Sequence, residues 1–184
     1  KIKDLHQINR EIDLVIKYLI NRKKEYLSKN KFIAWDYNNK YKPDIHIKRG
    51  YLDIKDNVSF LYHRDALRCF GYRGGHHQRA VWSVKGTRKG VWFPKLYENN
   101  EWNNSLSDNF EKIEMRKKDN SKLSIEFKEV EWCVFAHYKD FLGNTVYRFL
   151  GEFHSSRELS TEYCRIFLRN KTKVDLINYQ KENR

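Results

Sequence analysis

The sequence predicts an α+β protein in which one long N-terminal amphipathic helix precedes a bent antiparallel sheet or barrel. Along the first 29 residues, apolar side chains recur at steps of three and four, as on a helix with one apolar face. Through the second half of the chain, short apolar stretches alternate with turn-forming residues, a pattern typical of successive strands. A length of 184 residues with 40% hydrophobic side chains suffices to bury a substantial core.

The N-terminal helix is expected over residues 2–29. Its apolar stripe consists of Ile2, Leu5, Ile8, Ile12, Val15, Ile16, Leu19 and Ile20. Such a stripe packs on the protein's own core, forms a homodimer contact or connects to a further domain. An aromatic linker with Trp35, Tyr37 and Tyr41 follows. We therefore expect a helix-and-linker segment at residues 1–45 and a mainly-β domain at residues 46–184.

Two short elements are expected before the centre of the chain. Residues 45–47, Ile-His-Ile, favour a short strand, and residues 59–70 favour a short helix. The core candidates of this helix are Leu61, Ala66, Leu67 and Phe70. Gly71 follows where helices commonly end in a left-handed residue.

Residues 71–97 predict a glycine-hinged loop, a strand, a basic turn and a second strand. Gly74 and Gly75 allow positive φ angles or a close approach of the backbone to a ligand. Residues 80–85 alternate between two faces, the period of a half-buried strand. Residues 86–90, Gly-Thr-Arg-Lys-Gly, have the length and glycine content of a hairpin connection. Arg88 and Lys89 are thus expected at an exposed tip.

The rest of the chain predicts turns and short strands. Residues 98–109 are rich in Asn and Ser and favour turns, with Trp102 either closing one end of a barrel or facing a ligand. Strands are expected at residues 112–115, 122–127, 131–138, 146–153 and 163–168, and residues 173–179 close the chain.

The composition indicates a polyanionic partner. The chain carries 37 Lys and Arg against 24 Asp and Glu, a net charge of +13, which is typical of proteins that bind nucleic acid or an anionic membrane surface. An aromatic content of 15% excludes a disordered basic tail. No apolar run approaches the roughly 18 residues of a membrane span. Of the two kinds of partner, nucleic acid is expected and a membrane is not. Three widely spaced cysteines without a Cys-x-x-Cys pair indicate a reducing compartment, the cytoplasm.

Basic and amide side chains cluster where DNA contacts are expected, because Arg and Lys bind phosphates and guanine while Gln pairs with adenine. The candidate DNA-binding residues are Arg73, Gly74, Gly75, His76, His77, Gln78, Arg79, Lys85, Arg88, Lys89, Arg165, Arg169 and Lys171. If a base is flipped out of the duplex, Trp82, Trp92 and Trp102 are the candidates to stack on it. Binding of this kind needs no cofactor.

Two enzyme-like patterns are present. Glu126 and Lys128 match the Glu-x-Lys half of a nuclease site that binds Mg²⁺, with Asp119 or Asp108 as the upstream carboxylate. Cys133 and His137 offer one pair of metal ligands, whereas zinc sites normally show two close-spaced pairs, so no metal site is expected. A metal-dependent endonuclease therefore stays an alternative to a binding module.

Several segments together resemble a known family. They are residues 64–71 (Arg-Asp-Ala-Leu-Arg-Cys-Phe-Gly), residues 90–93 (Gly-Val-Trp-Phe), Asn103-Asn104, residues 147–153 (Tyr-Arg-Phe-Leu-Gly-Glu-Phe) and the Arg-containing stretch 165–169. In this order, over about residues 61–168, they are similar to the SRA/PUA-like modules associated with restriction endonucleases. The resemblance implies a bent barrel that reads double-stranded DNA by sequence or by base modification, within a restriction or defence system.

The same resemblance implies a nuclease domain or subunit outside this chain as a partner. An RNA-binding module of the same PUA-like barrel type is a further alternative, distinguished by a preference for single strands or hairpins.

Overall fold

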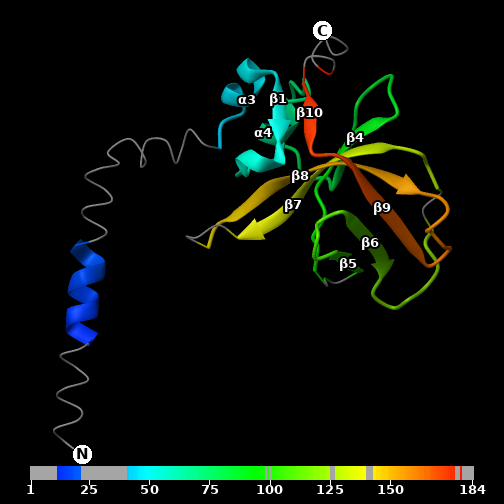
Figure 1. The fold of residues 1–184 in the computed structure, drawn as a ribbon. Coiled ribbons are helices and arrows are strands. Elements are labelled where there is room, and N and C mark those ends of the chain that lie inside the picture. The colour runs from blue at the N-terminus through cyan, green and yellow to red at the C-terminus, as the bar shows by residue number, and fades with distance from the viewer. Residues whose placement is uncertain are drawn as a thin grey trace, which may run out of the picture. The chain divides into compact units, whose positions relative to one another are not determined.

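The computed structural model describes residues 12–21, 41–97, 99, 101–124, 127–139, 143–176 and 179. The chain divides into two compact units, Lys1–Asn39 and Lys40–Arg184 (Figure 1). The sequence-based division into a helix-and-linker segment at residues 1–45 and a mainly-β domain at residues 46–184 remains a prediction. Within the described residues, no helix is both long enough and apolar enough to cross a membrane.

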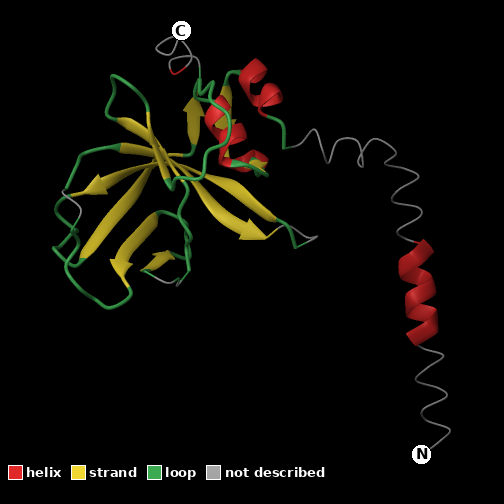
Figure 2. Ribbon diagram, turned by 180° about the vertical axis from the view of Figure 1, so that it is seen from behind, coloured by secondary structure: helices red, strands yellow, loops and turns green. Residues whose placement is uncertain are grey.

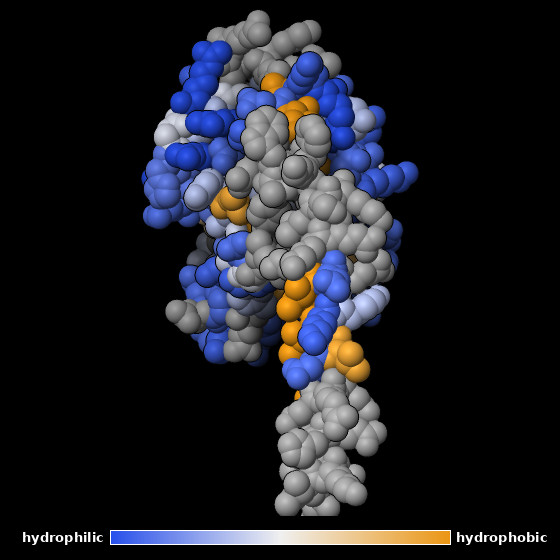
Figure 3. Space-filling view, turned by 90° about the vertical axis from the view of Figure 1, so that its left-hand side faces the viewer, coloured by the Kyte–Doolittle hydropathy of each residue, from blue (hydrophilic) through white to orange (hydrophobic). Residues whose placement is uncertain are grey.

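In the first unit, the described residues form one helix over residues 12–21. The remainder of the predicted helix and most of the aromatic linker lie outside the described residues. The apolar stripe is exposed on the helix, with side chains such as Val15 and Leu19 at 57% and 58% exposure (Figure 3). The predicted homodimer contact therefore has a candidate surface here, and dimerisation stays a prediction.

The second unit is mostly β-structure (Figure 2). Its strands are β1 (Tyr51–Asp53), β2 (Ser59–Phe60), β3 (Val81–Ser83), β4 (Lys89–Trp92), β5 (Trp102–Leu106), β6 (Lys112–Lys117), β7 (Glu131–Lys139), β8 (Thr145–Ser156), β9 (Cys164–Lys171) and β10 (Lys173–Asp175). Among the described residues, the main sheet has the order β3-β4-β7-β8-β9-β6-β5, with β2 also paired to β8 and a separate β1–β10 pair.

The main sheet is strongly bent and largely antiparallel, as the sequence predicts. The pair β4–β7 is the parallel exception among the described strands. The register shifts at Val134/Phe135 in β7 and at Glu152/Phe153 in β8. Such irregularities bend strands and increase their twist, which lets the long strands β7 and β8 curve around the core.

The segment predicted as a strand at residues 45–47 is instead part of helix α3 (Pro43–Arg49). Pro43 occupies the first turn, where its missing N–H costs no hydrogen bond. Gly50 ends the helix with φ 85°, and its N–H donates to the carbonyl of His46 at 2.8 Å. The strand prediction from the Ile-His-Ile alternation is therefore wrong. Pro43 and Gly50 favour a helix start and a helix end on either side of these three residues.

Helix α4 (His63–Arg68) is shorter than the predicted 59–70. Ser59 and Phe60 form β2 and pair with Arg148 and Tyr147 of β8. Gly71 has φ 87° and its N–H donates to the Arg68 carbonyl at 3.1 Å, which closes α4 as expected.

Two further segments differ from the sequence-based expectation. The polar stretch 98–109 contains strand β5, which occupies an edge of the sheet, where the exposed side chains of Asn103 and Ser105 are compatible with strand structure. The described part of the predicted strand 122–127 has no strand structure. Its start contacts Glu162 instead, because the Leu123 N–H donates to the Glu162 carbonyl and the Lys122 ammonium lies 2.7 Å from the Glu162 carboxylate.

The core consists of two apolar clusters. The larger cluster joins the α4 region, residues after β10 and one face of β7 and β8, including Phe60, Phe135 and Phe149. The smaller cluster includes Trp92, Phe153 and Phe167, and Trp92 packs on Phe167 with ring centroids 4.7 Å apart. The successive residues Trp92 and Phe93 of the β4 region belong to different clusters, so this short stretch links the two halves of the core.

Candidate nucleic-acid interface

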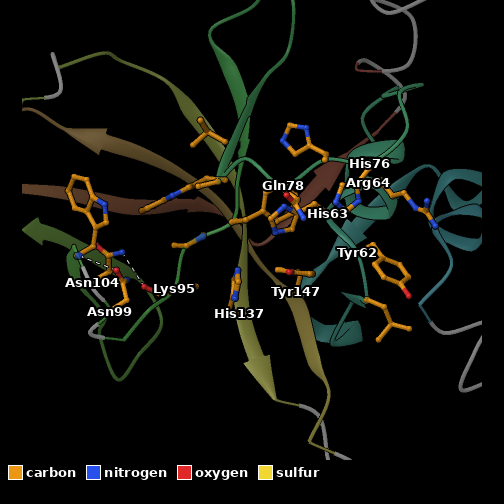
Figure 4. A pocket seen from close by; sticks show the side chains of 18 of the residues that line it. Tyr62, His63, Arg64, His76, Gln78, Lys95, Asn99, Asn104, His137 and Tyr147 are labelled. Carbon is orange, nitrogen blue, oxygen red and sulfur yellow. Dashed lines mark hydrogen bonds between the residues drawn. The ribbon is translucent and has the colours of Figure 1, made fainter.

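A cavity of about 720 Å³ opens between the start of α4, the loop after it, the end of β4 and strands β5, β7 and β8 (Figure 4). We call it the His63 pocket. Its lining residues include Tyr62, His63, Arg64, His76, His77, Gln78, Trp92, Phe93, Lys95, Asn99, Trp102, Asn104, Met115, His137 and Tyr147. Aromatic and imidazole rings thus meet amide and cationic groups around one space.

Ring contacts arrange the inner wall. His63 stacks on Phe93, with centroids 3.9 Å apart and planes 15° from parallel, and its ring meets Tyr147 edge-on at 4.3 Å. His137 and Tyr147 are direct partners in the β7–β8 register, so their side chains lie on the same face and meet at 4.7 Å and 90°. His77 approaches His63 from the loop at 6.2 Å.

Burial keeps the two inner histidines neutral. It lowers the pKa of His63 from 6.5 to about 4, and the positive charges that His137, His77 and His76 carry when protonated act in the same direction, with weak opposition from the His77 backbone. Burial also lowers the pKa of His137 to about 4, with help from Lys95 and Lys139. Near neutral pH each imidazole therefore offers one donor and one acceptor rather than a charge.

Several polar atoms in this wall are buried but have no hydrogen-bond partner of good geometry among the described residues. They are both ring nitrogens of His63, Nε2 of His77 and Oδ1 of Asn104. The Asn104 amide is oriented by its other end, because Nδ2 donates to the Lys95 carbonyl at 3.1 Å. A buried unpaired polar group costs about 1–3 kcal/mol, so a ligand with complementary groups would recover that free energy.

The rim is basic and partly aromatic. Arg64 lines the pocket, and its guanidinium lies over the Tyr62 ring at 5.2 Å with Asp65 at 3.8 Å. Lys95 and Gln78, both labelled in Figure 4, are exposed. An anionic ligand would therefore meet cations at the entrance and neutral rings inside.

The comparisons with known proteins agree with this architecture. The model of the SRA family, the SET and RING associated domain, matches residues 45–176. The chain belongs to the SRA domain family. SRA domains bind modified DNA, and the resemblance seen over residues 61–168 is confirmed over a longer stretch.

One similar solved structure is "The 5-Hydroxymethylcytosine-Specific Restriction Enzyme AbaSI", with a TM-score of 0.65 and 24% sequence identity. The match covers 91% of this chain and 55% of that one, so this chain spans about half the length of that enzyme. The likeness establishes the fold. A search of curated proteins found no match.

The SRA domain brings part of the predicted loop to the pocket. His76, His77 and Gln78 line it, whereas Arg73 and Arg79 are exposed outside its lining. Gly74 packs against Tyr72, since a Cβ at this position would lie 2.3 Å from the Tyr72 hydroxyl. Gly75 has nothing within 4 Å of its Cβ position. The close approach of Tyr72 therefore favours glycine at position 74, whereas no contact does so at position 75.

The predicted basic tip is only partly correct. The hairpin between β3 and β4 forms as expected, with Lys85 and Arg88 exposed. Lys89 instead begins β4, and its ammonium lies 3.1 Å from Glu131 and 3.8 Å from Glu152. It is therefore held by carboxylates rather than presented at the tip, because the parallel pairing with β7 sets Lys89 opposite Glu131.

The basic residues of β9 lie away from the pocket. Arg165 is 7% exposed, and its guanidinium covers the Phe127 ring at 4.5 Å, so the expected surface contact with phosphate is not supported by its burial. Arg169 lies 3.9 Å from Glu111. Lys171 lies 2.5 Å from the buried carboxylate of Glu152.

The three tryptophans that were predicted to stack on a base have different environments in the SRA domain. Trp92 and Trp102 line the His63 pocket. Trp82 does not; its ring meets Tyr72 at 5.8 Å beside the larger core cluster. Trp92 is 7% exposed and committed to packing on Phe167, which leaves Trp102 as the more accessible stacking candidate.

Sequence reasoning missed much of the inner wall, namely His63, Phe93, His137, Tyr147 and the role of Asn104. No local pattern in the sequence marks His63, and His137 was considered only as a metal ligand beside Cys133. The pairing of His137 with Tyr147 depends on the β7–β8 register, which a single sequence does not display.

For the nuclease alternative, Glu126 lies outside the described residues. Asp119 is exposed in a turn and its carboxylate accepts the Ser121 N–H at 3.0 Å, and Lys128 is exposed as well. Among the described residues, no group of three or more His, Cys, Asp or Glu side chains is placed to hold a metal ion.

Proposed function

We propose that this chain is the DNA-binding part of a restriction or defence system, and that it takes an extruded modified base of double-stranded DNA into the His63 pocket. The main support is a set of buried polar atoms on His63, His77 and Asn104 that lack hydrogen-bond partners and lie inside an aromatic cavity. Family membership supports modified DNA as the ligand, and the lining of the pocket supports it as the binding site.

The size of the pocket supports a base-sized occupant. Its volume of about 720 Å³ lies within the about 300–1,000 Å³ that is typical of small-molecule sites. An extruded base is commonly held between aromatic side chains and hydrogen-bonded at its edge. Tyr147, Phe93 and Trp102 offer rings here, and His63 and Asn104 offer the edge contacts.

The unpaired atoms favour a base with an added polar group. A site built to hydrogen-bond a hydroxyl rejects an analogue that lacks it, because the site's own polar groups are then left unpaired. The restriction enzyme AbaSI, whose solved structure is similar to this chain, is described as specific for 5-hydroxymethylcytosine. We propose a cytosine with a polar 5-substituent as the base read by this chain.

Cations around the entrance support binding of the DNA backbone. Arg64 and Lys95 line the pocket, and Arg73 and Arg79 are exposed on the adjoining loop. Phosphate contacts of this kind fix position without reading sequence and weaken with salt. We propose these residues, with Lys85 and Arg88, as backbone contacts.

The proposal leaves cleavage to a nuclease domain or subunit outside this chain, and binding requires no cofactor. If the chain itself cut DNA, Mg²⁺ would be needed and Asp119, Glu126 and Lys128 would be the candidates. Cytoplasmic localisation stays a prediction from cysteine usage; the described Cys69, Cys133 and Cys164 are all free thiols.

The test is a fluorescence-anisotropy titration of the purified chain against duplexes that carry cytosine, 5-methylcytosine or 5-hydroxymethylcytosine at one position, and against an RNA hairpin. Tightest binding to the hydroxymethylated duplex is expected, with no cleavage on a gel in the presence of Mg²⁺. Equal affinity for all three duplexes would contradict base reading. Preference for the hairpin would favour the RNA alternative, and cleavage with Mg²⁺ would favour the nuclease.

A further inference from the structure

A second cavity, of about 270 Å³, lies where the turn after the η1 segment (Ile54–Asp56), the β5–β6 connection and strands β7, β8 and β9 meet. Its lining residues are Ile54, Asn57, Asn109, Phe110, Tyr138, Arg148, Phe149, Leu150 and Arg169. None of these residues lines the His63 pocket, and none of these described residues is acidic.

Strands β7 and β8 contribute different side chains to the two cavities. His137 and Tyr147 line the His63 pocket, whereas their chain neighbours Tyr138 and Arg148 line the second cavity. Successive side chains of a strand point to opposite faces of the sheet, so the second cavity is a separate site.

Arg148 has an unpaired donor in this cavity. Its Nε is buried and has no hydrogen-bond partner among the described residues. Its guanidinium lies over the Tyr138 ring at 5.2 Å, a diagonal cross-strand contact that holds the side chain in place.

Arg169 reaches the same cavity across a glycine. Gly151 has φ 111°, and a Cβ at this position would lie 2.9 Å from Cδ of Arg169. The missing side chain therefore leaves room for the arginine to cross β8. Its carboxylate contact, to Glu111 at 3.9 Å, is long, and Glu111 is itself 62% exposed, so this pair contributes little.

We infer that Arg148 and Arg169 form a phosphate-binding site on the face of the sheet opposite the His63 pocket. Two guanidinium groups line one small cavity without an acidic neighbour in its lining, and one of them has a buried N–H to donate. Arginine binds phosphate oxygens through paired N–H groups, and a bound phosphate group would neutralise both charges. Tyr138 and Phe110 supply apolar walls beside it.

The test compares the full chain with the variants Arg148→Met and Arg169→Met, and with Lys55→Met as a control for loss of one exposed charge near this region. Thermal unfolding is followed in sodium phosphate and in sodium chloride of equal ionic strength. Phosphate is expected to raise the Tm of the unmodified chain and of Lys55→Met, and to have no such effect on the two arginine variants.

A second readout does not depend on variant folding. Backbone amide NMR of the unmodified chain is expected to show saturable shifts at Asn57, Asn109 and Arg148 during titration with inorganic phosphate. Absence of saturable shifts, or saturable shifts confined to other regions, overturns the proposal.

Duplex DNA identifies the source of the phosphate. If the site holds a backbone phosphate, DNA binding by Arg148→Met depends less on salt, and the magnitude of the slope of log K against log salt decreases by about 1. An unchanged slope together with phosphate-dependent Tm assigns the site to free phosphate or a nucleotide. Base preference is measured at the His63 pocket, so failure of either proposal leaves the other testable.

Discussion

The His63 pocket and the surroundings of Glu152 both bury ionisable side chains, yet they treat them differently. Glu152 is 1% exposed, and its carboxylate accepts hydrogen bonds from Lys171 at 2.5 Å and from the Tyr179 hydroxyl at 3.3 Å, with Lys89 at 3.8 Å. His63 has ring nitrogens without such partners among the described residues. Paired buried groups hold a fold together, whereas unpaired ones leave free energy that a ligand can recover.

The largest effect is expected at Glu152. The change Glu152→Gln leaves Lys171 and Lys89 without their buried counter-charge. We expect a loss of roughly 2–3 kcal/mol in the free energy of unfolding, below the about 3–5 kcal/mol for a fully buried pair, because both lysines still reach solvent. Urea unfolding measures this change.

Glu131→Gln is the matched control, because Glu131 contacts the same Lys89 at 3.1 Å but is 38% exposed. Its loss should stay under about 1 kcal/mol. Equal losses for Glu131→Gln and Glu152→Gln would show that burial of the carboxylate does not set its contribution.

The next largest effect is a loss of stability at acidic pH that His63 and His137 cause. His63 and His137 have a pKa of about 4 in the folded chain, below the ordinary 6.5, so the unfolded chain binds these protons first as pH falls. Stability should therefore decrease as pH is lowered from about 6.5 to about 4. The double variant His63→Phe/His137→Phe should show a smaller decrease over that window in urea unfolding. Parallel curves for both proteins would mean that other groups carry the pH dependence.

A smaller effect is expected in the loop beside the pocket. Gly74→Ala pushes a methyl group against Tyr72, whose ring meets that of His77 at 5.7 Å. We expect DNA affinity to fall several-fold, about 1 kcal/mol, with little change in Tm. Gly75→Ala meets nothing within 4 Å and should bind like the unmodified chain in anisotropy titrations. A reversed order of the two variants would contradict the contact.

The smallest effect on stability is expected for His63→Phe. Replacing an imidazole that lacks a hydrogen bond of good geometry by an apolar ring that stacks on Phe93 should leave the unfolding free energy within about 0.5 kcal/mol, or raise it. Binding of modified DNA should fall in the same variant. A large loss of stability would place His63 with Glu152, as a structural residue.

The features that the sequence predicts correctly are those set by residues close together in the chain. The Gly71 helix end, the hairpin at residues 86–90 and the SRA resemblance follow from local signals, and the structure and the family match confirm them. The loop histidines His76 and His77 line the pocket, and their contact with DNA stays a prediction.

What the sequence did not predict depends on contacts between distant segments. The stack of His63 on Phe93 joins α4 to the end of β4, and Glu152 meets Lys171 and Tyr179 only after the sheet has formed. Lys89 was expected at a tip from its local sequence alone. Its actual position opposite Glu131 results from the parallel pairing of β4 with β7, which no local pattern encodes.

The most direct test of the central claim is photo-crosslinking of the chain to a duplex that carries one 5-iodocytosine, followed by mass spectrometry of the attached peptide. If the extruded base enters the His63 pocket, the crosslink should fall on lining residues such as His63, Phe93 or Tyr147, and excess hydroxymethylated duplex should suppress it. Crosslinks confined to the Lys85–Arg88 turn or to β9 would contradict the account.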